Sequence, residues 1–221
     1  MSFRNSSLRS LCVGAMLLVV GSPALAQSFY PSFQQPRVVS REFNFAIADG
    51  DNITPLVFQW REGTSPGTQL SLDLGLADPE NDALDTFFMV GGQYARMLTQ
   101  ARADMPLDLL LTAGLFGQFG NDITSIGVPV GVSVGHRFPL TGTSMAITPY
   151  IHPRVSLDYF SVNDESDTEL NITFDVGGNL EMTPQLALRL TAMFGNDADA
   201  FGLSLAWTPR GLRTASAPAT R

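Results

Sequence analysis

Residues 125–138 read SIGVPVGVSVGHRF, and two kinds of side chain alternate along them. The apolar positions are Ile126, Val128, Val130, Val132 and Val134. The positions between them are Gly127, Pro129, Gly131, Ser133 and Gly135. A period of two is typical of a β-strand with one apolar face. The opposite face carries small residues in place of the Lys, Glu and Thr expected of a water-exposed strand, so we expect it to line a confined space.

The same alternation extends outward from this strand over most of the chain. It predicts nine further strands, over residues 41–49, 54–62, 68–77, 85–97, 106–119, 145–160, 169–182, 185–194 and 200–207. Most of them come close to the length of about 9–11 residues that a tilted membrane strand needs, and their total is even. The sequence therefore predicts an all-β fold, an antiparallel up-and-down transmembrane β-barrel of about ten strands over residues 41–207.

Proline gives an alternative to the count of ten strands. Pro129, Pro149 and Pro153 lie inside predicted strands, and each lacks the N–H that a strand ladder needs. We expect bulges or kinks at these positions. The alternative is a barrel of eight strands in which strand 145–160 is broken and an N-terminal hairpin is loose.

The first 26 residues have the pattern of a secretory signal peptide. Arg4 and Arg9 precede an apolar run over residues 11–20, which is too short to span a bilayer as a helix. The small residues at the end of this segment predict cleavage between Ala26 and Gln27. The protein is thus expected to be exported and to reside in the outer membrane.

The segments on either side of the predicted barrel have no period. Residues 27–40 carry two prolines and predict an extended periplasmic linker, and residues 208–221 predict a flexible C-terminal tail. Cys12 is the only cysteine and lies in the signal peptide, so neither a disulfide nor a cysteine metal site is expected. No cofactor is predicted.

The charge composition limits the partners of the protein. Charged residues make up 15% of the chain, against roughly 25% in ordinary globular domains, and there is no lysine. Cleavage would leave 11 basic against 21 acidic residues. Nucleic acid is not an expected partner at this charge. No later run of 18 apolar residues predicts a membrane helix.

The small and polar faces of the strands are expected to point into the barrel. We predict a lumen network of titratable side chains that pair with one another, consisting of Asp73, Asp108, His152, Arg154, Asp158, Asp175, Glu181 and Arg189. A catalytic role for His152 is conceivable, but a hydrogen-bonded lumen histidine is the preferred interpretation, and no enzymatic activity is expected. In a soluble periplasmic lipid-binding β-barrel, the alternative, the apolar face would point inward.

Two kinds of connection alternate along the chain, which predicts a barrel with chemically different ends. One kind is rich in Asp and Asn and is assigned to the outer surface, and the other carries Arg and Pro and is assigned to the periplasm. Aromatic residues at the strand ends predict two girdles at the membrane interfaces. The periplasmic girdle is Phe43, Trp60, Tyr94, Phe138 and Trp207, and the outer girdle is Phe88, Phe119, Tyr159, Phe194 and Phe201.

Carboxylates cluster in the acidic connections. Clustered carboxylates can bind Ca²⁺ or Mg²⁺, and such ions could also bridge to the phosphates of lipopolysaccharide. The candidates for weak Ca²⁺ or Mg²⁺ binding are Asp49, Asp51, Asp164, Glu165, Asp167, Asp197 and Asp199. Solvated loops are the preferred interpretation, because no cluster has the spacing of a dedicated calcium loop.

Residues 41–207, with their alternating strands, small inner face and aromatic girdles, resemble the superfamily of small opacity-type and porin-like outer-membrane β-barrels. The resemblance implies contact with outer-membrane lipid and lipopolysaccharide, and insertion by the barrel assembly machinery. One departure is that Trp207 is followed by a tail, whereas such proteins usually end on an aromatic residue that the machinery reads.

Four functions remain in view at this stage. A structural or surface role with acidic extracellular loops is expected first. A narrow porin-like channel for small solutes is the next, since the small residues of strand 125–138 leave room in the lumen. A soluble lipid-binding barrel and a barrel enzyme are the others, and the small number of histidines argues against the enzyme.

Overall fold

The computed structural model describes residues 30–50, 53–79, 85–121, 123–162, 165–195 and 199–210. The predicted signal peptide, its cleavage site between Ala26 and Gln27, and most of the predicted C-terminal tail lie outside these residues. Among the residues described, no helix has the length and hydropathy of a membrane span.

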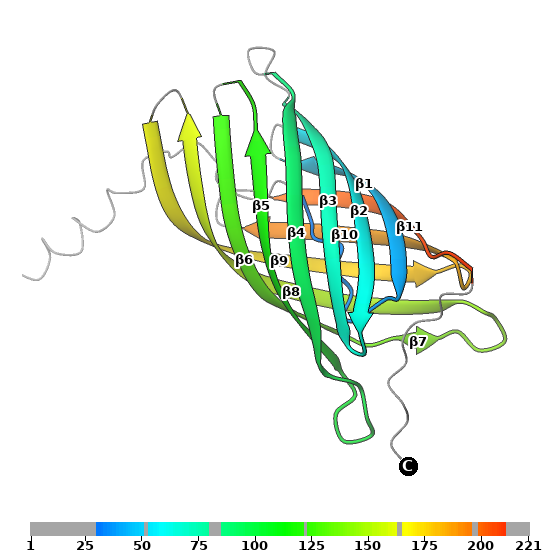
Figure 1. Ribbon diagram of the computed structural model, residues 1–221. Coiled ribbons are helices and arrows are strands. Elements are labelled where there is room, and N and C mark those ends of the chain that lie inside the picture. Colours follow the sequence, from blue (N-terminus) through cyan, green and yellow to red (C-terminus); the bar gives the residue numbers. More distant parts are fainter. Residues whose placement is uncertain are drawn as a thin grey trace, which may run out of the picture.

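The described chain forms a closed antiparallel β-barrel with ten long strands (Figure 1). The strands are β1 (Arg41–Gly50), β2 (Ile53–Ser65), β3 (Thr68–Pro79), β4 (Phe87–Thr99), β5 (Asp108–Phe119), β6 (Ile123–Gly135), β7 (Phe138–Pro139), β8 (Ala146–Val162), β9 (Glu165–Glu181), β10 (Leu186–Gly195) and β11 (Ala200–Trp207). β7 is a two-residue strand that extends the hairpin between β6 and β8. The predicted fold class and the strand count of ten are confirmed.

Each long strand pairs with the next one along the chain, and β1 pairs with β11 to close the barrel. The pairing is in register from Phe43 opposite Trp207 to Gly50 opposite Ala200. A closed sheet has no edge strand, so every strand of the wall has a neighbour on both sides.

The prediction of bulges at the prolines is wrong. Pro129 pairs with Ser156, and Pro149 and Pro153 pair with residues of β9, without a shift of register. In the described strands the register shifts are at Gly63/Ser65 and at Met97/Thr99, close to hairpin turns. A missing proline N–H removes one hydrogen bond of the ladder, and the neighbouring pairs on both sides hold the alignment.

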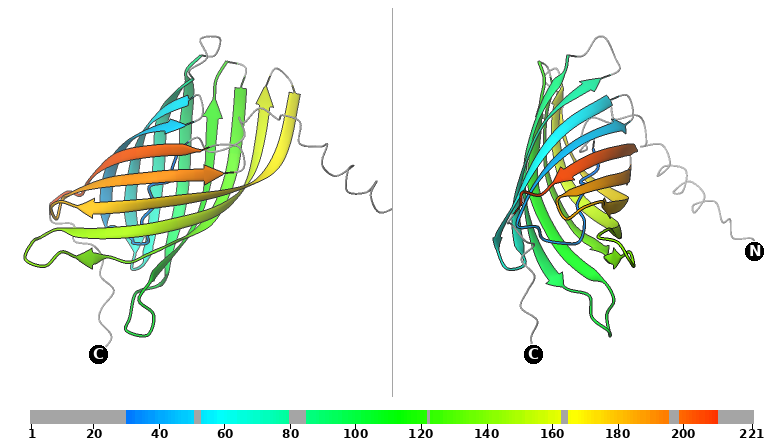
Figure 2. Two further views of the ribbon diagram at one scale, coloured as in Figure 1. Left: turned by 180° about the vertical axis from the view of Figure 1, so that it is seen from behind. Right: turned by 90° about the vertical axis from the view of Figure 1, so that its right-hand side faces the viewer.

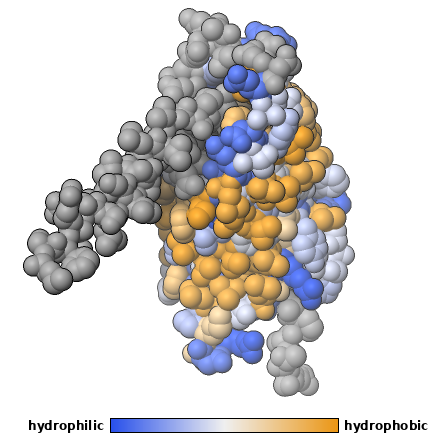
Figure 3. All heavy atoms as spheres, turned by 90° about the vertical axis from the view of Figure 1, so that its left-hand side faces the viewer, coloured by the Kyte–Doolittle hydropathy of each residue, from blue (hydrophilic) through white to orange (hydrophobic). Residues whose placement is uncertain are grey.

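The apolar face of the barrel points outward and the polar face points inward. In β8, Ile151, Val155 and Leu157 are exposed, whereas His152 and Asp158, at the alternate positions, are fully buried. Exposed apolar side chains continue around the wall and form a band between hydrophilic ends (Figure 3). The alternative of a soluble barrel with an apolar interior is therefore contradicted.

The two ends of the barrel differ, as the connections predict. We call the end with the β2–β3, β4–β5, β6–β8 and β9–β10 hairpins the turn end, and the opposite end the loop end. All five predicted residues of the outer girdle and four of the five of the periplasmic girdle are at least 40% exposed near their assigned ends, and Phe43 is partly buried. At the turn end Phe43 stacks on Trp207 with ring centroids 5.7 Å apart.

Residues 30–40 lie inside the barrel, where they approach β1 through the lumen (Figure 2). Nearly all of them are buried, and the Phe33 side chain is completely buried. The prediction of an extended linker outside the barrel is wrong for these residues. Their lack of period fits a segment that forms no strand and is held by the surrounding wall.

Candidate functional site: the filled lumen

The N-terminal plug, residues 30–40, is bonded to the wall at several depths. Ser32 is fixed in the middle of the lumen: its N–H donates to Asp175 Oδ2 at 3.1 Å, and its hydroxyl donates to the same oxygen at 2.5 Å. Nearer the turn end, the Gln34 carbonyl accepts from the Ser133 hydroxyl at 2.6 Å, and Val39 N–H donates to Gln69 Oε1 at 3.0 Å.

Ser32 joins a cluster of buried polar side chains on β5, β8 and β9. His152 Nδ1 lies 2.7 Å from Ser32 Oγ, and His152 Nε2 lies 2.9 Å from Thr112 Oγ1. Because the single hydroxyl proton of Ser32 goes to Asp175, a neutral ring with its proton on Nδ1 satisfies these contacts. Arg154 Nη2 donates to the other oxygen of Asp175 at 2.9 Å. The cluster thus joins Ser32 of the plug to the wall at β5, β8 and β9.

A serine, a histidine and a carboxylate in contact are also the components of a nucleophilic site. In this cluster the Ser32 hydroxyl is bonded directly to Asp175, and all three side chains are buried. The cavity beside Ser32 has a volume of about 40 Å³, which is room for water and too small for an organic substrate. Through these contacts His152 and Asp175 hold Ser32 of the plug against the wall.

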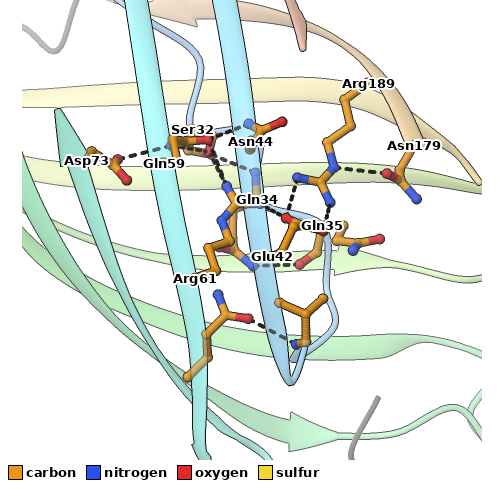
Figure 4. Close-up of polar contacts among 12 residues, drawn as sticks. Ser32, Gln34, Gln35, Glu42, Asn44, Gln59, Arg61, Asp73, Asn179 and Arg189 are labelled. Carbon is orange, nitrogen blue, oxygen red and sulfur yellow. Dashed lines mark hydrogen bonds and ion pairs between the residues drawn. The ribbon is translucent and has the colours of Figure 1, made fainter. Parts of the chain in front are cut away.

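Two arginines share one buried glutamate closer to the turn end (Figure 4). Arg189 donates to both oxygens of Glu42, at 2.8 and 2.6 Å, and Arg61 donates to Glu42 Oε1 at 3.1 Å. The side chains of all three are at most 4% exposed. Arg61 also donates to the Ser32 carbonyl at 3.0 Å, so this cluster contacts the plug as well.

A second glutamate binds two arginines at the turn end. Glu181 accepts from Arg37 of the plug at 2.9 Å, and from Arg137 at 2.6 Å. The hydrogen bonds that Arg137 donates to Glu181 raise the pKa of Arg137 above its usual value. Arg37, Arg137 and Glu181 line a cavity of about 770 Å³ that occupies the turn end of the barrel. The lumen is therefore wide at this end and narrows toward Ser32.

An apolar cluster fills part of the lumen toward the loop end. Phe33 and Tyr30 of the plug pack there in one buried cluster, together with wall residues from β1, β2, β3, β4 and β6. The wall residues are Ala46, Ala48, Ile53, Val57, Ala77, Phe87, Met89 and Ile123. The Tyr30 hydroxyl donates to Asp73 at 3.1 Å at the edge of this cluster. Apolar packing and polar contacts together fill the barrel across its width.

The predicted lumen residues lie in several separate sets of contacts. Of the predicted residues, His152 and Arg154 each contact Asp175. Asp158 is bonded to Ser156 and Asn171 and to no arginine in the described contacts. The wall partners that the sequence interpretation missed are Glu42, Asn44, Gln59, Arg61, Gln69, Thr112, Ser133 and Arg137, and the plug partners it missed are Tyr30, Ser32 and Arg37.

Asp108 does not belong to the lumen network. It lies at the first position of β5, where it accepts from Ala101 N–H at 2.9 Å and faces His136 at 3.8 Å. Asp108 therefore closes the β4–β5 hairpin at the turn end. The parity of the strand predicts that this side chain points inward, but parity does not tell how far along the barrel axis it lies.

The acidic clusters do not form a metal site in the described part of the chain. Asp49, Glu165, Asp167 and Asp199 are described, and no three His, Cys, Asp or Glu side chains among the described residues are close enough to hold one ion. The other candidates, Asp51, Asp164 and Asp197, lie outside the described residues. The prediction of weak Ca²⁺ or Mg²⁺ binding is not supported by the described carboxylates.

Comparison with known proteins identifies no family. No family model and no curated protein matches the chain. Solved structures with a similar barrel include the β domain of the Bordetella autotransporter BrkA, with 12% identity and a TM-score of 0.44 over 76% of this chain and 98% of that chain. They also include LpxR from Salmonella typhimurium, with 11% identity and a TM-score of 0.44 over 83% and 80% of the two chains.

A third structure is that of the KdgM porin in complex with disordered oligogalacturonate. It has 6% identity and a TM-score of 0.41 over 76% of this chain and 99% of that chain. Identities and scores of this size carry no argument about what the chain binds or does. The functional interpretation therefore rests on the chain's own residues.

Proposed function

We propose that this protein is an integral outer-membrane β-barrel with a structural or surface role, and that its lumen is closed at rest. One observation carries the proposal: a closed barrel presents exposed apolar side chains along every long strand. Soluble monomers rarely expose contiguous apolar patches larger than a few hundred Å². A closed barrel satisfies its backbone hydrogen bonds within the wall, which is the requirement for a β-structure in lipid.

The filled lumen supports a role that involves neither transport nor catalysis. The plug and the buried polar clusters occupy the interior, and the cavity at Ser32 is only about 40 Å³. The acidic connections at the loop end would then face the outside and contact lipopolysaccharide or another surface partner. Insertion by the barrel assembly machinery belongs to the same proposal.

Refolding into detergent tests the membrane location. We would refold residues 27–221 from urea with and without micelles, and measure circular dichroism and the gel mobility of boiled and unboiled samples. The proposal expects β-structure and a boiling-dependent mobility shift with micelles, and aggregation without them. A chain that folds and stays soluble without detergent would refute it.

A channel is the second candidate, and one feature of the lumen favours it. The interior is filled by a segment that is joined to the wall at Arg41, where β1 begins. A lumen closed by wall side chains alone could not open without rebuilding the barrel. A lumen closed by a tethered segment opens when that segment leaves.

A further inference from the structure

We propose that residues 30–40 are a removable plug and that the barrel without them is a channel that prefers cations. The inference rests on the membrane location proposed above and adds a conductance function and the element that controls it.

Side-chain contacts and apolar packing hold the plug in the lumen. It forms no strand, and the described backbone hydrogen bond between it and the wall is at its tethered end, from Gly63 N–H to the Ser40 carbonyl at 2.9 Å. Beyond that point its polar contacts involve wall side chains, such as Asp175 and Ser133. Such contacts can break without loss of any hydrogen bond of the barrel ladder.

The conformation of the plug depends on the lumen around it. Phe33 has a φ of 50°, in the left-handed region that residues other than glycine rarely adopt. Its ring is completely buried against Gly202 and Ala48, where a Cβ on Gly202 would overlap the ring. Strain of this kind persists only where the surroundings impose it, and it is typical of clamps and switches. The lumen therefore imposes this conformation on the plug.

Removal of the plug would leave an acidic pathway. Arg37 is the one charged residue in the sequence of the plug. Removal of the plug therefore breaks the ion pair between Arg37 and Glu181. The charged lumen side chains that remain are five carboxylates, Glu42, Asp73, Asp158, Asp175 and Glu181, and four arginines, Arg61, Arg137, Arg154 and Arg189. The sequence of the loop-end connections carries Asp and Glu and no arginine or lysine. Carboxylates at a pore and its mouth favour cations.

The direct test is a deletion of residues 27–39 measured in planar bilayers under a KCl gradient. We expect residues 27–221 to be silent, and the deletion variant to conduct with a reversal potential toward that of K⁺. A synthetic peptide with the sequence of residues 27–40 should close the open barrel. A deletion variant that inserts but is silent would overturn the plug, and a reversal potential toward that of Cl⁻ would overturn the cation preference.

A second pair of variants keeps the test decisive if the deleted chain does not fold. Asp175→Asn weakens both hydrogen bonds from Ser32 and should produce repeated openings in the full chain. Asp158→Asn is the matched control, because Asp158 is a buried lumen carboxylate whose described partners, Ser156 and Asn171, belong to the wall. Equal silence of both inserted variants refutes the plug.

The boiling-dependent mobility shift separates this inference from the proposed function. A parent chain that shows no shift and does not insert counts against the membrane location. An inserted parent together with silent variants counts against the plug alone.

Discussion

Glu42 is the residue whose loss should destabilise the barrel most clearly. Its carboxylate is bonded to Arg189 at 2.8 and 2.6 Å and to Arg61 at 3.1 Å, all with nearly no exposure. Glu42→Gln keeps the volume and removes the charge, so two buried guanidinium groups lose their anion. Breaking a buried ion pair by removal of one partner costs about 3–5 kcal/mol, because the remaining charge is uncompensated.

Chemical unfolding in micelles measures this loss. With guanidinium chloride, for which the slope is about 4 kcal/mol per molar, the midpoint should fall by about 1 M. The fluorescence of Trp60 and Trp207 reports the transition. Glu165→Gln is the control, because Glu165 is exposed at the end of β9, and its midpoint should equal that of the parent. Midpoints that are the same for both variants would show that the two arginines find other partners and would refute the reasoning.

Three further outcomes follow from the structure. Gly202→Ala places a methyl group in the space of the Phe33 ring and should lower the free energy of unfolding by about 1–3 kcal/mol through overpacking. Gly178→Ala is its control, because the added carbon meets no atom within 4 Å, and its unfolding midpoint should equal that of the parent. Leu74→Arg puts a charge on the outer face in the middle of β3 and should lower the stability of the barrel in lipid vesicles by about 2–4 kcal/mol; an unchanged unfolding curve would place this face outside the membrane. Trp60 lies in the turn-end girdle, so lipids brominated near the headgroup should quench its fluorescence more than lipids brominated near the chain end, and the reverse order would contradict the girdle assignment.

The barrel could be predicted from the sequence because its information is local and repeats. In β6 the alternation of Val128 and Val130 with small residues determines which side chains share a face, and the same pattern recurs in every long strand. The choice between inward and outward rests on composition: the polar face has small residues, which suit a lumen and not a water-exposed surface. The exposed fractions of Ile151 and Leu157, 49% and 54%, confirm that choice.

The plug could not be predicted because its information is not local. Its contacts join residues that are far apart in the sequence, as Ser32 and Asp175 are, or Arg37 and Glu181. A segment without period and with two prolines has the same local pattern whether it is a free linker or is enclosed by a wall. Its composition did contain a signal, because Tyr30 and Phe33 are aromatic and solvated linkers contain few aromatic residues. Both rings are buried in the lumen.

The small-residue face of β6 has a different use from the one that the sequence suggests. Narrow side chains predict free room and hence slow conduction, but the positions in front of them are taken by large groups from other strands. A Cβ on Gly127 would overlap Phe116 and Asp158, and one on Gly131 would overlap Arg154. Near the turn end a Cβ on Gly135 would come within 3.1 Å of Pro36 of the plug. The glycines thus accommodate the buried groups and the plug. Of these, the plug is the part that can leave, so its removal decides between a closed barrel and a channel.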